Sequence, residues 1–392
     1  MPDALGIAVI GAGMAGKAHA AAYRVAPTLY DSVLPPLRFV SIADVNAELG
    51  AATAQRYGYE RADTSWQAVA EADDIDVVSV VIANKLHREV VEGLLAAGKH
   101  VLCEKPLSDT LEDARAMAAA AASASTVARI GFTYRRAPGI AAIRDMILDG
   151  TLGRVLHFRG SYLCDYSCSP QAPWSWRYQG APGSGALADV GSHMAYIAEF
   201  LAGDITSVSG GALSTVITQR PMPLGAVVGH EHGAVSNEYR PVTNDDYAAF
   251  TAHFGDTVGV VEASRVAAGH PNGLSFEVYC ENGAATFYQG RPGQIELYLH
   301  SGPNRTNGYR TVIAGPELPY LAAGVPMDAQ GVGFGQNDYF AYQARALLDE
   351  VAGIPASASL PRNASFDEGV HNMEILAAVA ESAANDGKKV TL

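Results

Sequence analysis

The chain has 392 residues, of which 48% are hydrophobic, and its formal net charge at pH 7 is −14. This length and composition are typical of a globular protein with two domains of ordinary size. The acidic balance argues against nucleic acid or an anionic membrane as a partner, because both bind basic surfaces. No apolar run is long enough to cross a bilayer, and the apolar start of the chain ends in glycines, as a strand would. We therefore expect a cytoplasmic protein without a signal peptide.

Short apolar runs alternate with helical patterns through about the first 130 residues. The runs are almost continuously apolar, as are parallel strands that are covered by helices on both faces. The pattern predicts a doubly wound α/β domain of the Rossmann type over residues 1–133. Its expected strands are 5–10, 38–43, 76–83, 100–103 and 127–132, and its expected helices are 14–25, 46–56, 86–97 and 110–122.

The pattern changes after residue 133. Helical periodicity at 137–150 leads into a long strand at 154–163, and strand and hairpin signals dominate from about 205 to 315. Gly-Asp and Asn-Gly turns within this stretch favour antiparallel neighbours. Helical periodicity returns at 337–352 and 366–386. These signals predict a second domain, 134–392, of the α+β class with a large and mostly antiparallel sheet.

One part of this second domain has a different composition. Residues 219–245 are rich in proline, glycine and histidine, and we expect them to form a long irregular loop.

The sequence "AVIGAGMAGKAH" places a GxGxxG motif between the first strand and the first helix. Gly11 permits the tight turn, Gly13 lets the backbone approach a pyrophosphate, and Gly16 lets helix and strand pack closely. The N-terminus of the helix, with Met14 and Ala15, offers backbone N–H groups to the phosphates. The context therefore predicts a dinucleotide-binding site.

An acidic residue, Asp44, ends the second predicted strand. A carboxylate at this position can accept hydrogen bonds from the adenosine ribose hydroxyls. No arginine or lysine follows Asp44 until Arg56, so a 2′-phosphate would meet a carboxylate without a cationic partner. The sequence favours NAD over NADP.

The stretch "GSGALADVGSH", residues 183–193, places Asp189 and His193 four residues apart after two closely spaced glycines. If a helix starts here, both side chains lie on one face of it. One interpretation is a loop that closes over a small ligand and presents an acid–base pair to it. The other is a loop that enters a helix, with Asp189 as its N-cap and His193 one turn later.

The cysteines and histidines carry no clear metal signature. Cys103, Cys164, Cys168 and Cys280 form no CxxC pair, and reduced, mostly buried thiols are the default in the cytoplasm. The segment "GHEHG" at 229–233 looks like part of a zinc site, but it lacks the HExxH spacing and a helical pattern. We therefore expect no metal, either at Cys164 and Cys168 or at His230 and His232.

Several motifs in order carry a resemblance to a known family. "ANKLH" ends one predicted strand at 83–87, "GKHVLCEKPLS" ends the next at 98–108, "YRRAP" follows at 134–138, and "WSWRYQ" at 174–179 precedes the Asp-x-x-x-His stretch. Together with the GxGxxG motif they resemble the Gfo/Idh/MocA family of oxidoreductases over nearly the whole chain. Within that family the chain is most similar to bacterial pyranose dehydrogenases.

The resemblance implies a two-domain enzyme that binds its dinucleotide at the ends of the parallel strands. The second domain would bind the substrate and join subunits into a dimer or tetramer. The resemblance also implies a catalytic set of Lys105, Asp189 and His193. One departure stands out: the chain has Ile82-Ala83 before Asn84 where the family usually has Thr-Pro, so it lacks the proline that stiffens this turn.

Further contacts are expected around this set. Two of the residues expected to contact the substrate have a structural alternative: Tyr134 could belong to the core, and Arg135 could make only a salt bridge. The expected cofactor contacts beyond the glycine motif and Asp44 are Asn84, His87, Glu104, Lys105, Trp176 and Arg177. The expected substrate contacts are Lys105, Tyr134, Arg135, Asp165, Asp189 and His193.

These residue types suit the oxidation of a secondary alcohol, for which the protein must handle a proton while the cofactor accepts the hydride. A histidine can accept a proton near neutral pH, and a lysine can stabilise developing alkoxide charge. The favoured hypothesis is NAD-dependent oxidation of a cyclic sugar, anhydrosugar or polyol. Two alternatives stay open: an NAD-requiring glycosidase or dehydratase that oxidises its substrate transiently, and a non-enzymatic dinucleotide-sensing regulator.

Overall fold

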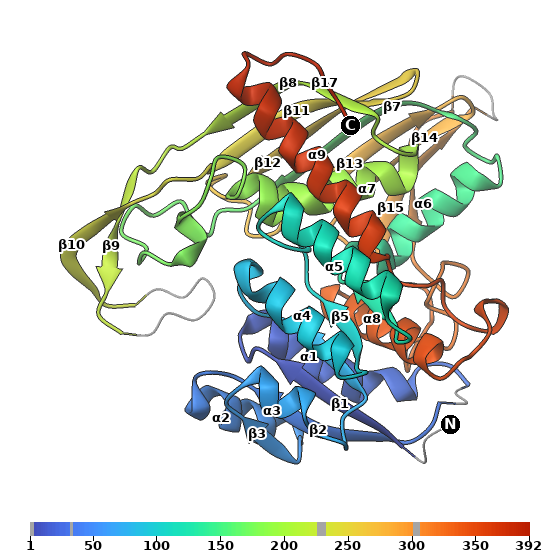
Figure 1. The fold of residues 1–392 in the computed structure, drawn as a ribbon. Coiled ribbons are helices and arrows are strands. Elements are labelled where there is room, and N and C mark those ends of the chain that lie inside the picture. Colours follow the sequence, from blue (N-terminus) through green and yellow to red (C-terminus); the bar gives the residue numbers. More distant parts are fainter. Residues whose placement is uncertain (1–3, 32–33, 226–232, 301–305) are drawn as a thin grey trace. The chain divides into compact units, whose positions relative to one another are not determined.

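A parallel sheet of six strands, in the order β3-β2-β1-β4-β5-β6, organises the N-terminal part of the chain (Figure 1). The structure is a computed structural model that describes residues 4–31, 34–225, 233–300 and 306–392. The strands are β1 Leu5–Ile10, β2 Leu37–Ala43, β3 Arg61–Asp63, β4 Val77–Val80, β5 His100–Cys103 and β6 Ala128–Ile130. The helices between them are α1 Met14–Val25, α2 Ala47–Tyr57, α3 Trp66–Ala70, α4 His87–Ala96 and α5 Leu111–Ser123. The predicted Rossmann architecture is confirmed, with β3 and α3 as short additions.

This sheet belongs to a unit that is discontinuous in sequence. The chain divides into unit 1, which contains the residues up to Arg136 and Tyr320–Met373, and unit 2, which contains Ala137–Pro319 and Glu374–Leu392. Helix α8, Gln336–Val351, packs against α1, and its Ala344, Leu347 and Leu348 join the core beneath β1. The sequence predicts a second domain over all of 134–392, whereas Tyr320–Met373 belongs to unit 1. Helical periodicity shows that a helix has an apolar face but does not show which core that face joins.

Unit 2 contains a sheet of nine strands in the order β16-β15-β14-β13-β7-β12-β11-β8-β17. Its pairs are antiparallel except for β7 and β12, which are parallel. The predicted hairpin turns lie where expected, between β11 and β12 and between β13 and β14. The strands are β7 Val155–Leu163, β8 Ser207–Ser214, β11 Tyr247–Phe254, β12 Thr257–Ser264, β13 Gly273–Cys280, β14 Gly283–Tyr288, β15 Gln294–Leu299, β16 Arg310–Ile313 and β17 Val390–Thr391.

Helices cover one face of this sheet (Figure 1): α6 Pro138–Leu148, α7 Ser192–Ala202 and the C-terminal part of α9 Phe366–Ala384. Strand alternation places Phe158, Phe276 and Phe287 on the covered face, where their rings stack at centroid distances of 6.0 and 5.8 Å. Val258 and Val260 of β12 point to the other face and are 40% and 46% exposed. The sheet therefore has one face in the core and one open face.

The expected irregular loop at 219–245 is a wrong prediction for the part that is described. Strand β9, Gln219–Pro223, pairs antiparallel with β10, Val235–Pro241, as a separate two-stranded sheet. Most side chains of β10 are exposed, and a buried side chain of β9 is the charged Arg220, so neither strand shows an apolar periodicity. Their pairing depends on backbone hydrogen bonds, which the side chains do not reveal.

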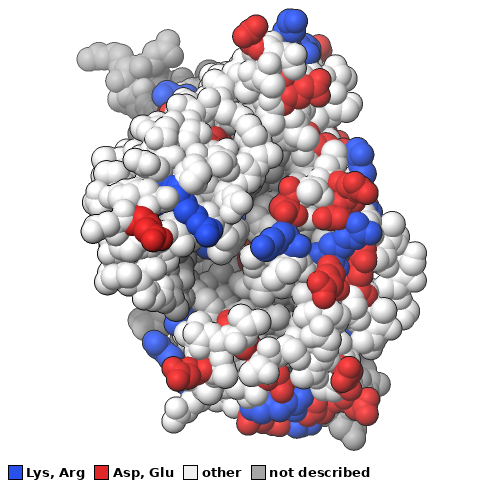
Figure 2. All heavy atoms as spheres, turned by 60° about the vertical axis from the view of Figure 1, so that its left-hand side comes forward, with Lys and Arg blue, Asp and Glu red and all other residues white. Residues whose placement is uncertain are grey.

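Charged side chains on the face shown in Figure 2 are mixed in sign. Lysine and arginine lie among aspartate and glutamate, and neither sign forms one continuous patch there. This face therefore carries no single interaction surface of one charge sign.

Candidate active site

The turn between β1 and α1 has the geometry that a dinucleotide site requires. Gly11 has φ = +103°, and a Cβ on it would lie 2.0 Å from the carbonyl oxygen of Val81. A Cβ on Gly16 would lie 1.8 Å from the carbonyl oxygen of Gly11, so helix and turn are in contact. A Cβ on Gly13 would meet nothing within 4 Å, and no side chain caps the N-terminus of α1 at this residue. Open space in front of an uncapped helix N-terminus fits a pyrophosphate.

Asp44 lies next to this turn, directly after β2. Its Oδ2 accepts a hydrogen bond from the Ala12 N–H at 2.7 Å, and its Oδ1 accepts one from the Asn46 N–H at 2.8 Å. The carboxylate therefore fixes the glycine turn at the carboxyl edge of the parallel sheet. This is the edge at which such sheets bind ligands.

Lys105 follows β5 at the same edge of the parallel sheet, and a buried network lies behind it. Glu104 Oε2 accepts the backbone N–H of Lys105 at 3.1 Å, and Glu104 Oε1 lies 2.9 Å from His19 Nε2. His19 Nδ1 lies 3.0 Å from the Ser79 hydroxyl, which also contacts the Tyr23 hydroxyl at 2.9 Å. Both carboxylate oxygens of Glu104, a predicted cofactor contact, are thus engaged within unit 1.

Glu104 carries a negative charge in this network. Burial alone raises the pKa of the Glu104 carboxyl, but the hydrogen bond and charge of His19, together with the charge of Lys105, lower this pKa below its ordinary value. The charged form is therefore the stable form next to Lys105.

The turn after β4 contains Asn84, which begins a short 3-10 helix, Asn84–Leu86. His87 follows it and is fully buried, with its Nε2 3.2 Å from the Ile82 carbonyl oxygen and its Nδ1 3.1 Å from that of Leu107. Burial lowers the pKa of His87. His87 thus ties down the turn that lacks the usual proline.

Two of the expected substrate contacts have structural partners in unit 1. Tyr134 is 1% exposed and meets Tyr339 edge to face at 6.3 Å between ring centroids. Arg135 Nη1 lies 3.5 Å from Glu368 Oε1. These contacts are the ones that the structural alternatives predict, a core position for Tyr134 and an ion pair for Arg135.

The glycine loop before Asp189 is held from outside by Asp245, whose side chain is buried. The Asp245 carboxylate accepts the backbone N–H groups of Gly183, Gly185 and Leu187 at 2.8, 3.0 and 2.8 Å. A Cβ on Gly185 would lie 2.0 Å from the Asp245 carbonyl oxygen, so only glycine fits there. Asp245 therefore accepts the free backbone N–H groups that an N-cap residue would accept, although it lies far away in the sequence.

The helix that follows begins with a π-helical turn, Leu187–Gly191, and continues as α7. Asp189 lies inside this π turn, so the interpretation of Asp189 as the N-cap is wrong. Tyr166 donates a hydrogen bond from its hydroxyl to Asp189 Oδ2 at 2.5 Å. His193 is 8% exposed and lies in the first turn of α7, with its ring 5.9 Å from that of Tyr162. Single π turns inside helices are frequent at functional sites.

The remaining predicted residues lie in the loop after β7. Trp176 is 43% exposed, and the Arg177 guanidinium lies 4.5 Å from its ring centroid. The Arg177 carbonyl accepts hydrogen bonds from Arg265 Nη1 at 3.0 Å and from Asn244 Nδ2 at 2.9 Å. Asp165 is partly buried, and its carbonyl closes a turn to the Cys168 N–H at 3.0 Å.

Sequence reasoning missed four residues that support the candidate site: His19, Ser79, Tyr166 and Asp245. Each acts through a contact with a residue more than twenty positions away. Only His19 carried a local signal, because it lies close behind the GxGxxG motif on the first helix.

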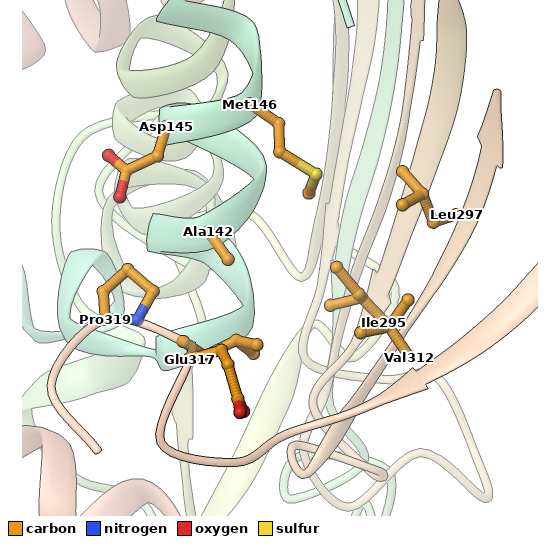
Figure 3. Close-up of a pocket in the computed structure, with 9 residues that line it drawn as sticks. Ala142, Asp145, Met146, Ile295, Leu297, Val312, Glu317 and Pro319 are labelled. Atoms are coloured by element: carbon orange, nitrogen blue, oxygen red, sulfur yellow. The ribbon is translucent and has the colours of Figure 1, made fainter. Parts of the chain in front are cut away.

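A separate hollow lies in unit 2 between α6 and the edge of the large sheet (Figure 3). Its volume is about 210 Å³, and Met146 of α6 and Ile295 and Leu297 of β15 line it. None of the predicted site residues lines this hollow.

The described ranges contain neither a metal-binding cluster nor a helix that could span a membrane. No group of three or more histidine, cysteine or acidic side chains among the described residues could hold a metal ion. Residues 226–232, with His230 and His232, lie outside the described residues. No described helix is long and apolar enough to span a membrane.

The fold and the glycine turn define a dinucleotide-binding domain of the Rossmann type. Residues 5–132 match the model of the oxidoreductase family with an NAD-binding Rossmann fold, and residues 140–286 match the Gfo/Idh/MocA C-terminal domain. The chain belongs to the Gfo/Idh/MocA family, which confirms the resemblance drawn from its motifs.

Individual relatives are similar over nearly the whole chain or over about half of it. Levoglucosan dehydrogenase of Pseudarthrobacter phenanthrenivorans is 35% identical over 97% of both chains. A solved structure of levoglucosan dehydrogenase with NADH and levoglucosan has a TM-score of 0.88 at 33% identity and 99% coverage of both chains. D-glucoside 3-dehydrogenase of Escherichia coli is 31% identical over 55% of this chain and 60% of its own.

Alanine substitutions at two glycines of the turn should have opposite effects on NADH binding and on thermal stability. Gly13→Ala should leave the thermal unfolding temperature nearly unchanged, because its Cβ points into open space, but should weaken NADH binding at least about tenfold by filling the pyrophosphate position. Gly16→Ala should lower the unfolding temperature, because its Cβ meets backbone. Thermal melts and fluorescence titration with NADH measure both, and normal NADH affinity of folded Gly13→Ala would contradict the placement of the pyrophosphate.

Proposed function

We propose that this protein oxidises a secondary hydroxyl of a cyclic sugar, anhydrosugar or polyol with NAD, and that Lys105, Asp189 and His193 are its catalytic set. The observation that carries the proposal is the position of Lys105. It follows β5 at the carboxyl edge of a parallel sheet whose first strand leads into the glycine turn. Ligands of such sheets bind outside this edge. The similarity to levoglucosan dehydrogenase over 97% of both chains supports the substrate class.

Each residue has a role that its chemistry supports. Bound NAD would supply the hydride acceptor. His193 takes the proton of the hydroxyl, Asp189 orients a neighbouring hydroxyl or favours the charged imidazole, and the Lys105 ammonium stabilises the developing alkoxide. The Glu104 carboxylate accepts the backbone N–H of Lys105 at 3.1 Å and so helps to hold this residue at the end of β5.

The catalytic assignment predicts a large loss of turnover without a loss of folding. His193→Ala should lower kcat by about 10²–10⁴ and should remove the rise of rate with pH that a histidine base produces. Lys105→Met should lower kcat similarly, and the double variant should be less impaired than the product of the two single effects. Stopped-flow measurement of NADH formation with levoglucosan, a D-glucoside and an inositol, normalised by circular dichroism for folded protein, tests this.

Two outcomes would contradict the proposal. Near-normal NADH formation in folded His193→Ala would leave that residue with a structural role. Substrate consumption without a proportional accumulation of NADH in the wild type would favour a glycosidase or dehydratase that oxidises its substrate transiently.

Preference for NAD over NADP should depend on Asp44. Its carboxylate, at the end of β2, repels a 2′-phosphate and accepts the ribose hydroxyls. Asp44→Asn should reduce the ratio of kcat/KM for NAD to that for NADP, while Asp63→Asn at the end of β3 should change the ratio little. Equal kcat/KM for the two cofactors in the wild type would rule the idea out.

The protein is proposed to self-associate as a dimer or tetramer through the open face of the large sheet. Val258 and Val260 on this face are exposed, and a second copy would cover them. Light scattering should show a multiple of about 41 kDa for the wild type and a smaller species for Val260→Asp. Leu148→Asp, on an exposed position of α6, is the control that should not change the mass. A wild-type mass of about 41 kDa at micromolar concentration would overturn the proposal.

A further inference from the structure

Asp189 has a side-chain partner within unit 2 that the proposed chemistry does not yet include. The Tyr166 hydroxyl donates to Asp189 Oδ2 at 2.5 Å, a length typical of a hydrogen bond from a hydroxyl to a charged carboxylate. Tyr166 lies in the loop after β7 and Asp189 lies in the π turn, 23 positions further on. The contact is thus made by tertiary structure and not by local geometry.

The phenol is a fixed donor. Burial, and then the negative charge of Asp189, raise the pKa of Tyr166 well above its ordinary value, while the positive charge of Arg265 lowers it and Cys164 adds a smaller rise. Tyr166 therefore keeps its proton over the whole pH range in which a histidine base works. A group that never releases its proton can orient a carboxylate but does not itself exchange protons with a substrate.

The segment that carries Tyr166 is anchored on both sides. The Cys164 N–H donates to the Ser264 carbonyl at 2.8 Å, and the Ser167 N–H donates to the Arg265 carbonyl at 3.0 Å. Arg220, which is fully buried, donates from Nη2 to the Ser167 carbonyl at 2.7 Å. The phenol is thereby held by main-chain contacts on either side of it.

The segment that carries Asp189 is anchored by a different group. Asp245 holds three amides of the glycine loop, and the Asp189 N–H donates to the Gly185 carbonyl at 2.9 Å. Main chain and side chain of Asp189 are therefore fixed independently, the first through Asp245 and the second through Tyr166.

We propose that Tyr166 is a positioning residue of the proton-transfer site, whose hydroxyl holds the Asp189 carboxylate charged and in one orientation. The proposal rests on the proposed function, because it assigns Tyr166 a role through Asp189. Loss of the hydroxyl leaves Asp189 in place but removes a donor that stabilises its charged form. The acid side of the pH–rate profile is therefore the readout that a merely structural tyrosine would not move.

The test compares Tyr166→Phe with Tyr279→Phe in the full-length protein, with NAD and levoglucosan as probes. The Tyr279 hydroxyl also donates to a carboxylate, that of Glu277, but on the large sheet and without a site residue as partner. Tyr166→Phe should lower kcat about 10- to 100-fold, leave NADH affinity unchanged and move the acid limb of the kcat profile to higher pH. Tyr279→Phe should change none of these.

Two results would overturn the role of Tyr166. If folded Tyr166→Phe keeps kcat within about twofold with an unmoved pH profile, the contact is structural only. If Tyr166→Phe lowers kcat as much as His193→Ala does and also removes the pH dependence of kcat, Tyr166 is itself an acid–base group. Failure of the proposed function is distinguishable, because His193→Ala would then form NADH normally whatever Tyr166→Phe does.

If Tyr166→Phe does not fold, replacement of Tyr166 by 3-fluorotyrosine keeps the ring and its hydrogen bond to Asp189 but makes the phenol a stronger donor. The acid limb of the kcat profile should then move to lower pH, because a stronger donor stabilises the charged Asp189 carboxylate more. An unmoved profile in the folded variant would overturn the proposal.

Discussion

The loops of unit 2 around the proposed acid–base residues depend on one interaction, the buried ion pair between Asp246 and Arg265. Its side chains are 0% and 1% exposed, and Asp246 Oδ1 accepts from Arg265 Nε at 2.8 Å. Two charges removed from water are stable only when their remaining donors and acceptors are satisfied. Asp246 Oδ2 accepts the N–H groups of Val216 and Ile217, and Arg265 donates further to Asn244 Oδ1 and the Arg177 carbonyl. Satisfying one pair thus fixes three separate loops.

The same short stretch, Asn244–Asp246, also governs the glycine loop. Asp245 stands between the two residues of the Arg265 network, and its carboxylate holds the amides that lead into the π turn. The residues that position the proposed acid–base pair therefore lie directly before β11 in the sequence. In unit 1 a partly buried carboxylate has a comparable task, because Glu104 joins the Lys105 backbone to His19 on α1. In each unit the proposed chemistry is supported by an acidic residue that is not itself in the predicted catalytic set.

Sequence alone predicted the parts whose signals are local. Continuous apolar runs predict five of the six parallel strands. Glycines at fixed spacing predict the cofactor turn after β1. Strand β3, Arg61–Asp63, is too short and polar for such a signal. The roles of Tyr166 and Asp245 depend on contacts made across the fold. The sequence also did not assign α8 to unit 1, because an apolar helix face can pack against either core.

The discontinuity of unit 1 has a consequence for the order in which the protein can fold. Arg345 of α8 donates to the Leu29 carbonyl across 316 positions of sequence, and α8 closes the apolar face of α1. During synthesis the Rossmann sheet emerges first, but its core lacks this cover until almost the whole of unit 2 has left the ribosome. Contacts of such long separation also slow folding, because a long loop must close before they form. The nucleotide-binding part of the chain is therefore the first to be made and among the last to be completed.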